Sequence, residues 1–154
     1  MSIKILLADD SQEKIKYIKE TLDSNIKYDV LDISNSYNST TKAIKKTNYD
    51  LVILDMSMPT FDAVDGQISA TPRPLAGKDV MSKLHYRGNK TPIIILTQFD
   101  VFGRLNDVVG IEDLKNDLKS SFPDNFKGCV FYDPQGSTWI SELLSIVDEV
   151  LKVE

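Results

Sequence analysis

The sequence predicts a doubly wound α/β fold, in which helices cover both faces of a parallel sheet of about five strands. Two patterns support this prediction: short runs of apolar residues with almost no polar interruption, and segments of helical periodicity between them. Nearly continuous apolar runs are typical of strands that are buried on both faces of a parallel sheet. Because strands and helices alternate along the chain, right-handed crossovers are expected, and ligands should bind where the strands end.

The expected elements alternate from one end of the chain to the other. The strands are expected at 3–8, 30–33, 51–54, 93–96 and 129–132. Between them, apolar side chains recur at helical spacing, as Ile15, Ile18 and Leu22 do in the first helix. The last helix, between 138 and 151, has the clearest apolar stripe, since its apolar residues follow the i, i+3, i+4, i+7 rule.

Composition excludes several classes of protein. The 154 residues fit one domain spanning 1–154, and 18 Lys and Arg against 23 Asp and Glu give a net charge of −5, which argues against a nucleic-acid partner. No apolar stretch approaches the length of a membrane-spanning helix, and no secretory leader is recognisable, so we expect a cytoplasmic protein without a membrane partner. Cys129, the single cysteine, lies in an apolar run and is expected to be a buried, inert thiol.

Acidic residues follow the first and third expected strands. Asp9 and Asp10 come directly after the first strand, Asp55 follows the third, and Thr97 ends the fourth. Because these strand ends converge at one edge of the sheet, the carboxylates should lie close together and need a counter-ion, for which Mg²⁺ is suited. An acidic magnesium site opposite a hydroxyl is typical of phosphoryl transfer. The alternative for Asp10 is a helix cap, since Glu13 stands at capping-box spacing from it.

The order of these motifs resembles the receiver domains of two-component response regulators. An apolar strand runs into Asp9 and Asp10, another runs into Asp55 with Met58 and Pro59 following in a D-x-x-M-P pattern, and residues 92–97 read P-I-I-I-L-T. The likeness covers nearly the whole chain apart from two insertions. It implies a flavodoxin-like sheet with strand order 2-1-3-4-5.

The resemblance also implies a role for each site residue. Asp55 would accept a phosphoryl group, and Asp9, Asp10, Asp55 and the backbone carbonyl of Ser57 would hold Mg²⁺. Thr97 would be the hydroxyl that moves toward the phosphoryl group. The protein would then be a stand-alone signalling protein rather than an enzyme, with a histidine kinase or phosphotransfer protein as donor and an unknown protein partner for its output.

The chain departs from the family at the end of the fifth strand. Receivers place a lysine before a proline there, and this chain has Asp133 before Pro134. An anion at that point would repel a phosphoryl group, so either phosphorylation is impaired or another cation takes the place of the lysine. The hypothesis from the sequence is that Arg73, Lys78 or Arg104 supplies it.

Two insertions separate the motifs. An extended loop follows the third strand at 59–77, and its Asp65-Gly66 pair predicts a small hairpin at about 61–70, followed by a strap stiffened by Pro72 and Pro74. The other insertion precedes the fifth strand and should contain a helix at roughly 110–121.

Two other functions remain open at the level of sequence. One is a pseudo-receiver that binds a partner through 59–77 without being phosphorylated. The other is a phosphohydrolase with an aspartyl-phosphate intermediate, although such enzymes want a second acid two residues after the nucleophile and this chain has Ser57 there.

Overall fold

The computed structural model describes residues 2–62, 72–98, 101–102 and 109–151. Its main sheet has five strands: β1 (Lys4–Ala8), β2 (Val30–Ser34), β3 (Leu51–Leu54), β6 (Ile93–Thr97) and β9 (Phe126–Phe131). They lie in the order β2-β1-β3-β6-β9, and every neighbouring pair is parallel. The predicted doubly wound sheet with order 2-1-3-4-5 is confirmed, with β6 and β9 as its fourth and fifth strands.

The strand bounds agree with the predicted ones to within one residue except at β9. This strand begins at Phe126 rather than at the predicted residue 129, and it ends at Phe131. Lys127 and Gly128 near its start are only partly covered or exposed, because β9 is at the edge of the sheet and pairs with β6 alone. An edge strand tolerates polar residues and glycine, so its first half lacks the apolar run that identifies the central strands.

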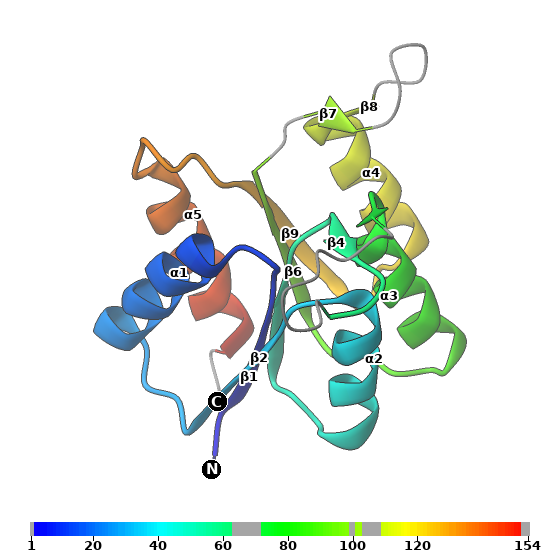
Figure 1. Cartoon of the computed structure of the whole chain (residues 1–154), viewed down its shortest axis with the longest axis horizontal. Coiled ribbons are helices and arrows are strands. Elements are labelled where there is room, and N and C mark those ends of the chain that lie inside the picture. The colour runs from blue at the N-terminus through cyan, green and yellow to red at the C-terminus, as the bar shows by residue number, and fades with distance from the viewer. Residues whose placement is uncertain (1, 63–71, 99–100, 103–108, 152–154) are drawn as a thin grey trace.

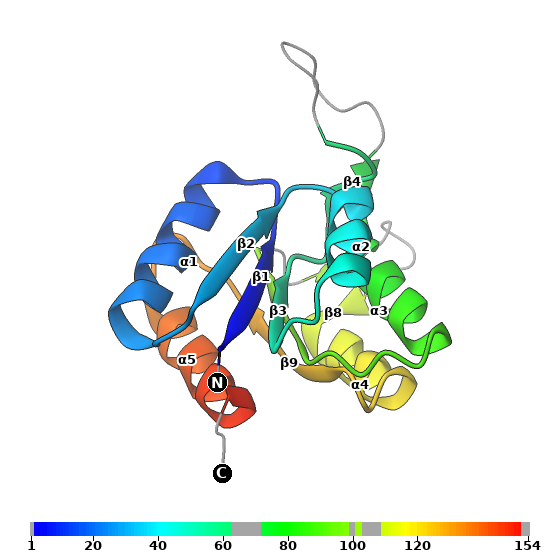
Figure 2. The ribbon, with the colours of Figure 1, turned by 90° about the horizontal axis from the view of Figure 1, so that it is seen from below.

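Helices cover both faces of the sheet (Figures 1 and 2). α1 (Gln12–Asn25) and α5 (Thr138–Leu151) lie on one face, and α2 (Tyr37–Lys46), α3 (Ala76–Tyr86) and α4 (Ile111–Ser121) lie on the other. The strands alternate between two apolar cores: in β1, Ile5 and Leu7 pack on the α1 and α5 side, whereas Leu6 and Ala8 pack on the other side. Both faces of the central strands are therefore buried. The carboxyl ends of these parallel strands lie at the same edge of the sheet.

The two insertions carry short two-stranded ribbons. β4 (Met58–Pro59) pairs antiparallel with β5 (Pro72–Arg73), so the predicted proline strap begins as a strand rather than as a plain connection. The predicted hairpin at 61–70 lies largely outside the described residues. β7 (Val101–Phe102) pairs with β8 (Val109–Gly110), and α4 confirms the helix predicted at about 110–121. None of the helices in the described ranges has the length and hydropathy to cross a membrane.

Candidate active site

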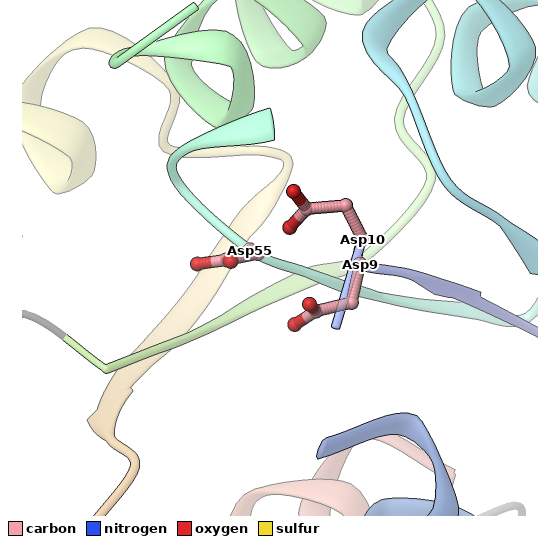
Figure 3. Close-up of side chains that lie close together, drawn as sticks. All are labelled: Asp9, Asp10 and Asp55. Carbon is pink, nitrogen blue, oxygen red and sulfur yellow. The ribbon is translucent and has the colours of Figure 1, made fainter. Parts of the chain in front are cut away.

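Three carboxylates meet at the carboxyl ends of β1 and β3. Asp9 and Asp10 follow β1, Asp55 follows β3, and the backbone N–H of Asp55 donates to the carbonyl of Ala8 at 2.9 Å. One oxygen from each of the three acids lies within 4.8 Å of the others (Figure 3). The predicted cluster is thus present. The parallel pairing of β1 with β3 brings together two strand ends that are far apart in the sequence.

The loop after β1 fixes Asp9 inside the site and leaves Asp10 at its surface. Asp9 is buried, and its Oδ1 accepts from the backbone N–H of Ser11 at 2.9 Å. Ser11 is also the N-cap of α1, since its side chain accepts from the backbone N–H of Lys14 at 3.3 Å. The alternative in which Asp10 caps this helix is therefore wrong, and Asp10 is exposed. The exposed carboxylate leaves this side of the cluster accessible to a cation.

The structure adds a residue that the sequence analysis missed. The amine of Lys14, in the first turn of α1, lies 2.6 Å from Asp9 Oδ2 and 3.6 Å from Asp55 Oδ1, and it donates to the carbonyl of Leu96 at 2.6 Å. Its side chain is only 3% exposed. The sequence does contain a signal for it, because Lys14 stands four residues before Ile18 and therefore on the apolar face of the helix. A lysine on that face needs a buried anionic partner.

The cations proposed from the sequence are engaged elsewhere. Arg73 forms an ion pair with Asp79 at 2.8 Å and stacks on the ring of Tyr37, and Lys78 pairs with Asp117 at 2.8 Å. Neither Arg73 nor Lys78 forms an ion pair with Asp55, because acids on α3 and α4 lie nearer to them, so the structure does not support the hypothesis that one of them supplies the missing charge. Arg104 falls outside the described residues, so its part of the hypothesis stays a prediction.

Burial and mutual repulsion disfavour the charged forms of the acids. Burial raises the pKa of Asp55 from its ordinary value of 3.8 to about 6, the charge of Lys14 opposes this increase, and the charge of Asp9 adds to it. The pKa of Asp10 is also raised, by burial first and by Asp9 next. The single charge of Lys14 therefore does not fully compensate the cluster. A divalent cation beside these carboxylates would complete the compensation.

Two buried oxygen atoms at the site lack hydrogen-bond partners. Among the described residues, neither Asp55 Oδ1 nor Thr97 Oγ1 makes a hydrogen bond, although both atoms are inaccessible to solvent. The Thr97 hydroxyl also lowers the pKa of Asp55, which places it near that carboxylate without a hydrogen bond of regular geometry. Unsatisfied buried oxygens are costly, so they fit a site that a metal ion and a phosphoryl group complete. Ser57 lies half-buried in the segment that joins β3 to β4.

The end of β9 carries a turn rather than a cation. Asp133 is exposed, its Oδ1 accepts from the backbone N–H of Gln135 at 3.0 Å, and its carbonyl accepts from Gly136 at 3.1 Å. This pattern is that of an Asx turn. Just before it, the buried Tyr132 places its ring 5.5 Å from the amine of Lys14. The local role of Asp133 is therefore to shape the connection to α5.

Comparison with known proteins agrees with the arrangement of the strands. The sequence profile of the response regulator receiver domain family matches residues 5–110. The Detocs response regulatory protein DtcB of Enterobacter cloacae is 35% identical over 154 residues, which covers 96% of this chain and 100% of that protein. An uncharacterized protein of Sinorhizobium fredii is 24% identical over 89% of this chain and 91% of its own length.

Solved structures of receiver domains share the fold. The signal receiver domain of an HD domain-containing protein from Pseudomonas fluorescens superimposes with a TM-score of 0.65 at 18% identity, covering 99% of this chain and 96% of that one. The receiver domain of a sensor histidine kinase from Pseudomonas aeruginosa, which has a magnesium ion coordinated in its active site cleft, gives 0.62 at 17% identity, covering 99% of this chain and 100% of that one. With the match of the family profile and the relative from Enterobacter, these findings show that the chain belongs to the response regulator receiver domain family.

Proposed function

We propose that this protein is a phosphorylation-dependent signalling protein in which Asp55 accepts the phosphoryl group and Mg²⁺ is the cofactor. The observation that carries the proposal is the meeting of three acids within 4.8 Å of one another, next to a buried Thr97 hydroxyl that has no hydrogen-bond partner among the described residues. Asp9, Asp10, Asp55 and the carbonyl of Ser57 would hold the metal. Membership of the receiver family supports each of these roles, since receivers signal by phosphorylation.

The chemistry requires the ionised form of Asp55. One of its carboxylate oxygens attacks phosphorus, the bond from phosphorus to the histidine nitrogen of the donor breaks, and the nitrogen keeps the electron pair. The product is an acyl phosphate on Asp55. Mg²⁺, when bound, neutralises the carboxylates and offsets the charge that develops on the phosphoryl oxygens. Asp9 is held in place for this purpose by the N–H of Ser11.

Thr97 connects the site to the surface on which we expect a partner to bind. It ends β6, and its backbone is aligned with Phe131 of the edge strand β9. If the Thr97 hydroxyl moves toward a phosphoryl oxygen, the β6–β9 edge changes with it, and so does the face formed by α4, β9 and α5. Phe131 is 40% exposed on that face. A histidine kinase or phosphotransfer protein in the cytoplasm would be the donor, and the output would pass through a protein partner.

Intact mass spectrometry tests the proposal. The native chain is incubated with Mg²⁺ and acetyl phosphate, beside Asp55→Asn and the control Asp148→Asn, which removes an exposed acid on α5. We expect one added phosphoryl group on the native chain and on Asp148→Asn, and none on Asp55→Asn. Because a protein can require its own donor, a titration with beryllofluoride and Mg²⁺ accompanies the mass measurement.

The same experiments separate the alternatives. A native chain that binds neither beryllofluoride nor Mg²⁺ would overturn the proposal in favour of a phosphorylation-independent binding module. Continuous turnover of a phosphate ester that depends on Asp55 would instead indicate a phosphohydrolase. The presence of Ser57 two residues after Asp55, where such enzymes place a second acid, weighs against that outcome.

A further inference from the structure

We propose that Lys14 is the phosphoryl-binding cation of this site and replaces, from the first turn of α1, the lysine that receivers carry at the end of the fifth strand. This inference rests on the proposed phosphorylation of Asp55 and assigns the contact that Asp133 cannot make. The amine of Lys14 lies 3.6 Å from Asp55 Oδ1. Within the described ranges, Lys14 is the basic residue whose ion pair includes Asp55.

The hydrogen-bonding pattern of the amine leaves one donor for the phosphoryl group. A lysine has three N–H donors. Two of them are accounted for by Asp9 Oδ2 and the carbonyl of Leu96, both at 2.6 Å. The distance of 3.6 Å to Asp55 Oδ1 is too long for a hydrogen bond, and Asp55 Oδ1 itself has no partner among the described residues. The third N–H of Lys14 therefore has no acceptor at hydrogen-bond distance among the described residues, and it lies beside Asp55, where it can donate to an oxygen of a phosphoryl group that Asp55 carries.

The amine contacts the cluster at Asp9 and Asp55 and not at Asp10. In Figure 3 the carboxylates of Asp9 and Asp10 lie on either side of Asp55, and α1 lies on the side of Asp9. Lys14 makes its short contact with the buried Asp9, whereas Asp10 is exposed. The amine therefore leaves the Asp10 side accessible. Lys14 and a divalent cation together carry the charge that balances three carboxylates, so the two cations complement each other rather than compete.

The carbonyl of Leu96 holds the amine beside the switch residue. Leu96 immediately precedes Thr97, so the hydrogen bond from Lys14 ties α1 to the end of β6. Tyr132 covers the amine from the β9 side, with its ring centroid 5.5 Å away. These contacts hold the long side chain of Lys14 in one conformation. An exposed lysine would instead lose conformational freedom when it binds an anion. Lys14 is therefore preorganised for a phosphoryl oxygen next to Thr97.

Substitutions at Lys14 test the assignment by beryllofluoride binding. Lys14→Met keeps the length of the side chain and removes its charge, Lys14→Arg keeps the charge, and Lys16→Met removes an exposed lysine from the same helix as the control. Binding is followed by the ¹⁹F NMR signals of bound beryllofluoride, and Mg²⁺ binding is titrated separately. We expect Lys14→Met to bind beryllofluoride about ten- to a hundredfold more weakly, which is the loss of one charge-assisted hydrogen bond. Its affinity for Mg²⁺ should be unchanged or higher.

A double variant tests whether a lysine at the end of β9 can replace the positive charge of Lys14. Lys14→Met with Asp133→Lys returns a lysine to the end of β9 and should recover beryllofluoride affinity, whereas Lys14→Met with Lys16→Arg should not. Lys14→Met that binds beryllofluoride as tightly as the native chain would overturn the inference while the proposed function stands. A native chain that binds no beryllofluoride at all would instead remove the proposed function itself.

A measurement on the native chain covers the case in which Lys14 variants do not fold. The NH₃⁺ resonance of a buried, hydrogen-bonded lysine can be followed by ¹H–¹⁵N NMR. We expect the Lys14 signal to shift on addition of beryllofluoride with Mg²⁺ and to shift much less with Mg²⁺ alone. An unchanged Lys14 signal at saturation with beryllofluoride would contradict the assignment.

Discussion

The carboxyl ends of β1 and β3 keep the charged residues of the receiver family, whereas the carboxyl end of β9 does not. At the first two ends, Asp9, Asp10 and Asp55 lie within reach of one metal ion. At the third, Asp133 stands where receivers place a lysine, and it forms a turn with the backbone N–H of Gln135. The positive charge beside Asp55 comes from Lys14 on α1 instead. The comparison supports our proposal that the position of the positive charge near Asp55 matters more than the element that carries it.

The helix after β1, α1, is well placed to supply the positive charge in place of the end of β9. α1 begins at Gln12, directly after the acidic loop, so its first turn lies against the same edge of the sheet as the acids. A lysine in that turn can reach Asp9 and the end of β6 without leaving the buried face of the helix. An aspartate at the end of β9 is then tolerated, because it points into a turn at the surface.

The largest effect is expected from removing the charge of Lys14. In Lys14→Met without metal, the buried Asp9 loses its partner at 2.6 Å, and breaking a buried pair in this way costs about 3–5 kcal/mol of unfolding free energy. Urea denaturation in EDTA measures the loss, with Lys16→Met as the exposed control that should change stability by less than about 0.5 kcal/mol. Equal stabilities for the two variants would show that Lys14 does not compensate Asp9.

The fold could be predicted because the central strands have simple patterns. Residues 51–54 are apolar throughout and form β3 with the predicted bounds, since both faces of this strand are buried. The start of β9 could not be predicted in the same way, because Lys127 and Gly128 at the edge of the sheet carry no apolar signal. The order of the strands followed from the resemblance to the receiver family, and the pairing of β1 with β2 and β3 confirms it.

The acids of the site could be predicted from the sequence, whereas for its lysine the sequence shows only that Lys14 lies on the apolar face of its helix and not which acid it contacts. Asp9, Asp10 and Asp55 directly follow strands, and strand ends have fixed neighbours once the order of the sheet is known. The reach of a lysine depends on the side chains that surround it. Lys78 therefore pairs with Asp117, 39 residues away, while Lys14 extends to the carbonyl of Leu96, 82 residues away. Only the three-dimensional arrangement shows which of the two faces Asp55.

A smaller effect is expected from the pH dependence of Asp55. Because the pKa of Asp55 is raised from 3.8 to about 6, the folded chain holds this proton more tightly than the unfolded chain does. The stabilisation of the folded chain by protonated Asp55 is fully present below pH 3.8 and is lost as the pH rises through about 6. Asp55→Asn lacks this loss, so in EDTA it should be more stable than the native chain above pH 6, by about 3 kcal/mol at most.

Urea denaturation at a series of pH values checks the sign. The stability advantage of Asp55→Asn should grow from pH 4 to pH 7, whereas Asp148→Asn, at an exposed position of α5, should show no such trend. Mg²⁺ should reduce the advantage, since it compensates the charge of the native cluster. An advantage that shrinks with rising pH would mean that Lys14 already compensates Asp55 fully, and the division of charge between Lys14 and the metal would have to be revised.

The smallest effect is expected at the end of β9, where two substitutions of Asp133 separate shape from charge. In the native chain, Asp133 Oδ1 accepts from the N–H of Gln135 at 3.0 Å. Asp133→Asn keeps a side-chain oxygen for this hydrogen bond, so it should change the free energy of unfolding by less than about 0.5 kcal/mol. Asp133→Ala removes that acceptor and should cost about 1 kcal/mol. Neither should change beryllofluoride affinity as strongly as Lys14→Met does, because the carboxylate points into the turn beside Gly136. If Asp133→Asn alone raised that affinity tenfold or more, the negative charge at this position would act on the site directly. The contrast between the end of β9, where Asp133 only shapes a turn, and the ends of β1 and β3 would then be wrong.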